Sequence, residues 1–169
     1  MKNITTTFLN DLEKRLDKLK EKELNSLVEK LNKKQPYLTA FCDATEEIFE
    51  DETDYLDLLN YFFLLINDAF EQTYGNCETI PPELIEITDN KHVDLLEKLE
   101  GSEDFEEKII ELFDKHEQSD LIYYIYDSIF DDEIDYDDKS LELSTQLAIF
   151  AYTIIDIYSI FYQTSNSKK

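Results

Sequence analysis

Glycine and proline are scarce in this 169-residue chain, which has two of the first and three of the second. An all-β fold needs many tight turns, and tight turns depend on these residues. Their scarcity disfavours such a fold, whereas the abundant Leu, Glu, Lys and Ile suit helices. We therefore expect an all-α protein, with residues 1–169 forming one domain. It should be a helical bundle or short α-solenoid of about seven to eight helices.

Cysteine is scarce as well, since Cys42 and Cys77 are the only two and form no C-x-x-C pair. The first residues lack the apolar segment of a secretory signal peptide. Reduced thiols and a cytoplasmic location are the expectation from this pattern. Cys42 lies among apolar residues and is expected to fill space in the core.

Long hydrophobic runs are few. The longest, Leu147–Tyr162, is interrupted by Thr153, Asp156 and Ser159. A membrane-spanning helix needs about 20 predominantly apolar residues, so this run is too short. We expect a buried core helix and no membrane partner.

Positive charge is the most conspicuous deficit. The chain has 16 Lys and Arg against 40 Asp and Glu, for a net charge of −24. Residues 35–90 contain 14 acids and residues 117–138 contain nine acids, with no Lys or Arg in either stretch. Such a field repels nucleic acid and anionic lipid and attracts cationic surfaces. We expect a basic protein partner and no direct binding of nucleic acid.

One acidic motif occurs twice, as Ile48–Tyr55 and again as Ile129–Tyr136, 81 positions later, with six of eight residues identical. The same offset aligns apolar positions in the segments that precede the motif. Self-similarity at a fixed offset is typical of repeat architectures. The sequence therefore predicts two related halves, approximately residues 5–88 and 91–163, and a frayed tail at 164–169.

Apolar spacing and capping residues predict the individual helices. The expected helical segments are 8–19, 24–34, 36–49, 54–74, a short helix from about 81 to 87, 93–99, 105–113, 121–130 and 141–162. Residues 121–126 and 154–158 are rich in residues that favour β-strands, which would allow strands there. The shortness of these stretches and the lack of turn residues favour helices instead.

The repeated acidic turns are the predicted partner-binding site, because aromatic residues ringed by charge are common binding anchors. Tyr123, Tyr124 and Tyr126 lie on adjacent faces of one helix, so at least one of them is expected to point outward beside the second turn. The predicted site residues are Glu50, Asp51, Glu52, Asp54 and Tyr55 in the first turn, and Asp131, Asp132, Glu133, Asp135, Tyr136, Asp137 and Asp138 in the second.

The sequence gives little support for metal binding or catalysis. A calcium loop starting at Asp131 would need glycine at its sixth position, where Tyr136 stands. His92 and His116 have no second ligand at metal-binding spacing, so both are predicted to be surface residues. The chain contains no glycine-rich phosphate loop and no nucleophile elbow. We expect no catalytic residues, no metal, no cofactor and no enzyme activity.

The expected function is an acidic helical protein-binding module. It would bind a basic protein, for instance a nucleic-acid-binding one, and inhibit or regulate it in the manner of DNA mimics, immunity proteins or counter-defence proteins. The alternative is a structural or scaffolding helical repeat protein whose acidity serves solubility. The sequence leaves the oligomeric state open, as well as the choice between solenoid and bundle.

Overall fold

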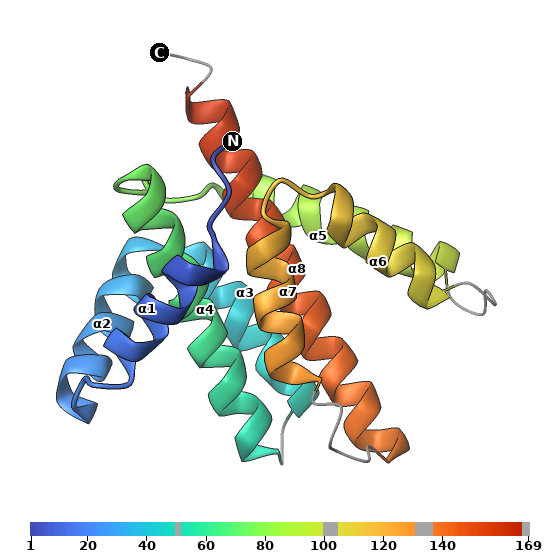
Figure 1. The fold of residues 1–169 in the computed structure, drawn as a ribbon, viewed down its shortest axis with the longest axis horizontal. Coiled ribbons are helices and arrows are strands. Elements are labelled where there is room, and N and C mark those ends of the chain that lie inside the picture. The colour runs from blue at the N-terminus through green and yellow to red at the C-terminus, as the bar shows by residue number, and fades with distance from the viewer. Residues whose placement is uncertain (50–51, 100–104, 131–136, 167–169) are drawn as a thin grey trace.

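A computed structural model describes residues 1–49, 52–99, 105–130 and 137–166 (Figure 1). The described residues form eight α-helices and one short 3-10 helix, with no strand among them, which confirms the expected all-α fold. The helices are α1 (Thr6–Leu16), α2 (Glu21–Lys34), α3 (Pro36–Glu46), α4 (Thr53–Tyr74), α5 (Pro82–Leu99), α6 (Phe105–Lys115), α7 (Ser119–Ile129) and α8 (Asp138–Asn166), and the 3-10 helix η1 (Glu47–Phe49) follows α3.

Local chemistry explains several helix ends. The Thr5 side chain accepts a hydrogen bond from the Phe8 backbone N–H and caps α1. Pro36 occupies the first position of α3, where its missing N–H costs nothing. Gly75 stops α4 with a backbone φ of +93°, in a region that favours glycine.

Helix α5 differs from the prediction, because one continuous helix replaces the two expected segments at about 81–87 and 93–99. Thr88 lies between those two segments. The Thr88 side chain is buried, and its hydroxyl donates a hydrogen bond to the Leu84 carbonyl at 2.8 Å, so the residue is satisfied inside the helix. The predicted boundary between the halves, at residues 88–91, thus lies within a helix.

Helix α8 is longer than predicted, and Thr164, Ser165 and Asn166 belong to it. This part of the expected tail is therefore helical, and residues 167–169 lie outside the described residues. Helix α8 is also the one described helix that is long and apolar enough to cross a membrane. Two thirds of that stretch is buried inside the protein, as in the core helix of a bundle.

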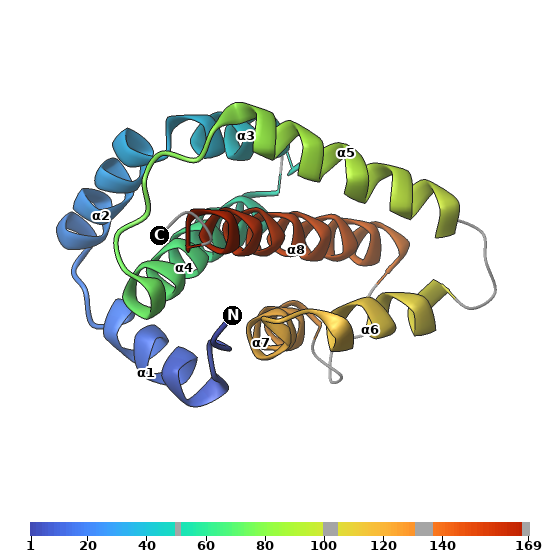
Figure 2. The same ribbon diagram turned by 90° about the horizontal axis from the view of Figure 1, so that it is seen from above.

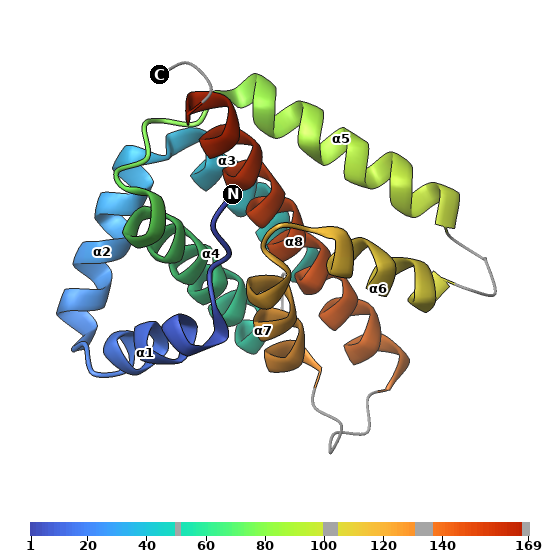
Figure 3. The ribbon, with the colours of Figure 1, turned by 45° about the horizontal axis from the view of Figure 1, so that its top comes forward.

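Helices α4 and α8 run side by side in the same direction through the centre of the molecule (Figures 1 and 3). The rings of Phe70 and Tyr158 stack at 5.1 Å between centroids, and those of Tyr74 and Tyr162 approach to 5.3 Å. The buried Tyr158 hydroxyl donates a hydrogen bond to Asn67 at 2.7 Å. In each of these two pairs, the residue of α8 follows that of α4 by 88 positions, and Phe70 also stacks on Tyr162 at 5.9 Å.

The eight described helices form two interlocked sets of four, with α1 to α4 as the first set and α5 to α8 as the second, and each set contributes one helix of the central pair. Helix α1 packs on α4 and on α7, while α5 packs on α8 and on α3. The first helix of each set thus packs on the third helix of the other set. Because of this exchange, the chain forms one bundle and not a linear stack of repeats (Figure 2).

Two buried glutamines make matching bonds in the two sets. Gln35 precedes α3, accepts a hydrogen bond from Ile80 N–H at 2.9 Å and donates one to the Glu78 carbonyl at 3.0 Å. Gln118 precedes α7, accepts from Ile4 N–H at 2.9 Å and donates to the Lys2 carbonyl at 3.2 Å. Each glutamine therefore fixes the segment that leads into the first helix of the other set.

Candidate functional site

The described flanks of the two acidic turns lie side by side, where α4 and α8 begin. The Tyr55 hydroxyl donates a hydrogen bond to the Ser140 carbonyl at 3.0 Å and lies 3.1 Å from Ser144 Oγ. Glu52 forms an ion pair with Lys139 across the same junction. We name this region the acidic corner and define it by Glu52, Asp54, Asp57, Asp137, Asp138 and Glu142, all exposed except the half-buried Glu52.

Of the twelve predicted site residues, the structure describes Glu52, Asp54, Tyr55, Asp137 and Asp138 and brings them together at this corner. Asp137 caps α8, accepting hydrogen bonds from the backbone N–H and the hydroxyl of Ser140, each at 2.7 Å. These bonds lower the pKa of the Asp137 carboxyl. The remaining predicted residues, Glu50, Asp51, Asp131, Asp132, Glu133, Asp135 and Tyr136, lie outside the described residues.

Tyr55 joins the two flanks and does not stand free. Its ring is half-buried and stacks on Phe49 at 5.8 Å, and its hydroxyl is bound within the chain. Tyr123, Tyr124 and Tyr126 of α7 are all half-buried, and the hydroxyl of Tyr123 makes its hydrogen bond at the surface. The first two donate hydrogen bonds to Asp114 and Glu13, each at 2.7 Å.

Bases from the first two helices pair with the other end of α4. Arg15 binds Asp68 at 2.7 Å and Lys34 binds Glu71, both in the C-terminal half of that helix. These two ion pairs lie away from the acidic corner. Lys139 supplies the cation seen in an ion pair there.

The two histidines contradict the prediction that both are surface residues. His92 of α5 is 3% exposed, and the His116 side chain, just after α6, is 11% exposed. Both converge on Asp156 of α8: His92 Nε2 lies 3.0 Å from Oδ2 and His116 Nε2 lies 3.5 Å from Oδ1. Lys91 Nζ approaches Oδ2 at 3.3 Å.

Hydrogen bonds fix the tautomers. The Gln118 N–H donates to His116 Nδ1 at 3.0 Å, so the imidazole proton is on Nε2 and faces Asp156. The Asp156 carboxylate can only accept, so His92 Nε2 donates to it, and His92 Nδ1 lies 2.9 Å from the Thr153 hydroxyl. Burial alone would raise the pKa of Asp156, but bonds from His116 and His92 and the charge of Lys91 outweigh it and hold the pKa well below its usual value.

This histidine–aspartate network (Lys91, His92, His116, Thr153 and Asp156) ties α5 and the start of α7 to the central helix. Its imidazoles direct Nε2 at the carboxylate itself. In the part of the chain that the structure describes, no group of three or more His, Cys, Asp or Glu side chains is placed to hold a metal ion.

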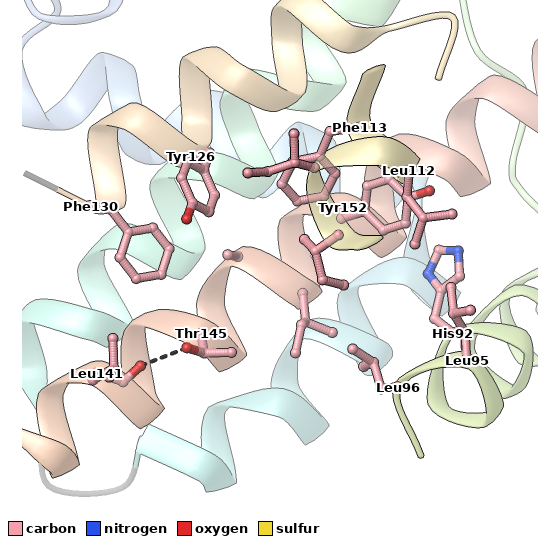
Figure 4. A pocket seen from close by; sticks show the side chains of 14 residues that line it. His92, Leu95, Leu96, Leu112, Phe113, Tyr126, Phe130, Leu141, Thr145 and Tyr152 are labelled. Atoms are coloured by element: carbon pink, nitrogen blue, oxygen red, sulfur yellow. Dashed lines mark hydrogen bonds between the residues drawn. The ribbon is translucent and has the colours of Figure 1, made fainter. Parts of the chain in front are cut away.

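An apolar groove begins beside the network and opens between α5, α6, α7 and α8 (Figure 4). It has a volume of about 420 Å³. His92 lies at one end and Leu141 at the other, and Ile110 and Leu141 are each 48% exposed. The lining residues are His92, Leu95, Leu96, Ile109, Ile110, Leu112, Phe113, Tyr126, Phe130, Leu141, Thr145, Ala148, Ile149 and Tyr152.

Compared with protein-family models, curated proteins and solved structures, the chain matches none of them. The site must therefore be interpreted from its own geometry.

Sequence reasoning missed the network and the groove, although two signals pointed to the network. Asp156 is a carboxylate within an apolar core helix, and a buried charge requires a partner. His92 follows Ile85 and Thr88 at helical spacing on one face of α5, and both of those residues are buried. The groove gave no such signal, because its side chains have the spacing of ordinary core residues.

Proposed function

We propose that this protein is an acidic protein-binding module that binds a basic protein and inhibits or regulates it. By this proposal it acts in the manner of DNA mimics, immunity proteins or counter-defence proteins. The observation that carries the proposal is the acidic corner. There, the starts of two helices that carry exposed carboxylates meet although they are far apart in the sequence, and Arg15 and Lys34 pair with the other end of α4.

Electrostatics supports a cationic partner. The corner presents Asp54, Asp57, Asp138 and Glu142 to solvent within the first turns of two adjacent helices. Carboxylates gathered in this way create a negative potential that steers a basic surface toward it. Association of this kind is fast and weakens as salt screens the charges.

The test is capture of basic proteins from the source cell or its host at low and high salt, with two matched variants. The corner variant carries Asp54→Asn, Asp57→Asn, Asp138→Asn and Glu142→Gln. The control variant removes the same amount of charge from exposed positions elsewhere, through Asp11→Asn, Glu21→Gln, Glu83→Gln and Glu86→Gln.

We expect wild type and the control variant to bind a basic partner at low salt and to lose it at high salt. The corner variant should bind about tenfold or more weakly, which corresponds to about 1.4 kcal/mol or more. Salt-independent binding, or equal losses in the two variants, contradicts the proposal.

A scaffolding role has less support. The apolar stripe of α2, which could pair with another copy, packs on α3 and α4 within the chain. Leu31 is buried, and Leu24, Leu27 and Val28 are half-buried against the core. A light-scattering mass at two salt concentrations distinguishes a self-associating scaffold from a monomeric binder.

A further inference from the structure

We infer that the apolar groove between α5, α6, α7 and α8 is a docking site for a partner helix, one with an apolar face and basic residues flanking it. This inference rests on the proposed function, because it specifies how a basic protein would be held. It concerns a surface other than the acidic corner, so the two can be tested separately.

The first support comes from comparing equivalent positions in the two sets of helices. The buried glutamines before α3 and α7 give an offset of 83, and the ring pairs Phe70–Tyr158 and Tyr74–Tyr162 give one of 88 for α4 and α8. Helices α2 and α6 end at Lys34 and Lys115, an offset of 81.

With these offsets, six groove residues correspond to polar residues in the first set, whereas Ile109, Leu112, Ile149 and Tyr152 correspond to the apolar Val28, Leu31, Tyr61 and Leu64. On α7, Tyr126 and Phe130 correspond to Asp43 and Glu47. The remaining pairs, on α8 and α6, are Leu141 with Thr53, Thr145 with Asp57, Ala148 with Asn60, and Ile110 with Glu29. All six first-set counterparts are exposed.

The fold therefore tolerates a polar, solvated surface at these positions. Packing within the chain does not explain why the second set carries Ile110 and Leu141 there, each about half exposed. Large exposed apolar residues at the rim of a groove are typical of an interaction site.

The shape of the groove suits a helix. Its floor on α8 runs from Leu141 through Thr145, Ala148 and Ile149 to Tyr152, a stripe at helical spacing. Eleven residues of rise give a length of about 16 Å, or three helical turns. An open channel of this length fits an amphipathic helix laid into it, a common mode of peptide recognition.

The net charge of the helices around the groove favours a basic partner helix. Helices α5, α6, α7 and α8 together contain 14 acids and five bases, a net charge of −9. A second copy of the chain would bring another −24 to the contact, so the groove is unsuited to pairing with itself. A helix with Lys or Arg beside its apolar face would place cations against the acidic surroundings.

The experiment measures binding of two synthetic fluorescent peptides of about 18 residues, long enough to cover the groove. One carries Leu on one helical face and Lys on the other, and the second has the same composition in a scrambled order. The groove variant is Ile110→Gln with Leu141→Gln, and the control is Ile87→Gln, which changes an exposed isoleucine of α5 outside the groove.

We expect wild type and the Ile87→Gln variant to bind the amphipathic peptide about tenfold or more tightly than the scrambled one. The groove variant should lose this preference. In methyl NMR spectra, the peptide should shift the signals of Ile110 and Ile149 and leave Ile87 unchanged.

Equal binding of the two peptides, or an undiminished preference in the groove variant, overturns the docking inference. So does a doubled light-scattering mass that the groove substitutions abolish, which would assign the groove to a second copy. The proposed function fails by a different result, which is the absence of salt-dependent capture that the acidic corner controls.

Discussion

The two sets of four helices follow the same order, yet they end in different surfaces. In the first set, α2 packs against both α3 and α4. In the second set, α6 packs on α7, while the space between α6 and α8 remains an apolar groove. Near the C-terminal end of α6, Phe113 and His116 reach Tyr152 and Asp156 of α8.

This comparison distinguishes the packing features that both sets share from the features that only one set has. Both sets keep a buried glutamine before their third helix and aromatic residues between the central helices. These are requirements of packing. The groove and the histidine–aspartate network belong to the second set alone among the described residues; the network holds α5 and the start of α7 to α8, and the groove is the surface that we associate with recognition.

The largest expected effect comes from removing the carboxylate that ties the second set together. Asp156→Ala leaves two buried imidazoles without their acceptor, and breaking a buried charged network costs about 3–5 kcal/mol. Urea unfolding of the variant and of wild type measures the loss. The control is Asp68→Ala, whose partner Arg15 is largely exposed; this change should cost about 1 kcal/mol or less.

The next effect tests whether the two sets are equivalent. Gln35→Ala and Gln118→Ala each leave a buried backbone N–H without its acceptor, which costs about 1–3 kcal/mol. We expect similar losses in thermal unfolding for both variants, and a much smaller one for the exposed Gln72→Ala. A large loss from one glutamine and none from the other would break the equivalence.

The pH dependence of the free energy of unfolding tests whether the charge of Asp156 stabilises the fold. Because its pKa is lowered in the folded state, the carboxylate stabilises the protein at pH values above its unfolded pKa, about 3.9. As pH falls below this value, the unfolded carboxyl gains a proton first and the stabilisation is lost, by up to about 1.4 kcal/mol per pH unit. The stability gap between wild type and Asp156→Asn should therefore narrow between pH 5 and pH 3. A constant gap in urea unfolding across this range would show that the charge does not matter.

The smallest expected effect is at the groove. Ile110→Gln and Leu141→Gln change half-exposed side chains, so the free energy of unfolding should move by about 0.5 kcal/mol or less for each. Chemical denaturation checks this. A loss above about 2 kcal/mol would mean that both side chains belong to the core, and the contrast between the two sets would then disappear.

The sequence predicted the fold class and most helix positions, because apolar spacing and capping residues are local signals. Pro36 and Gly75 marked helix ends that the structure retains. The break expected between residues 87 and 93 is absent, and Thr88 within this stretch bonds the Leu84 carbonyl as part of the continuous helix α5.

Contacts between residues far apart in the sequence could not be predicted from local patterns. His92 and His116 meet Asp156 across separations of 64 and 40 residues, and spacing along one helix cannot reveal such a meeting. The acidic flanks could be located in the sequence, but their junction through Tyr55 and Ser140 depends on two helices that run parallel.

The matched glutamines also constrain the order in which the chain can fold. During synthesis, Gln35 and Ile80 become available to each other while the second set is still being made. Ile4 must wait for Gln118, 114 residues later. A nascent chain that stops short of α7 can therefore hold α1 only through its contacts with α4, such as the Arg15–Asp68 ion pair, and leaves the Ile4 N–H without its acceptor.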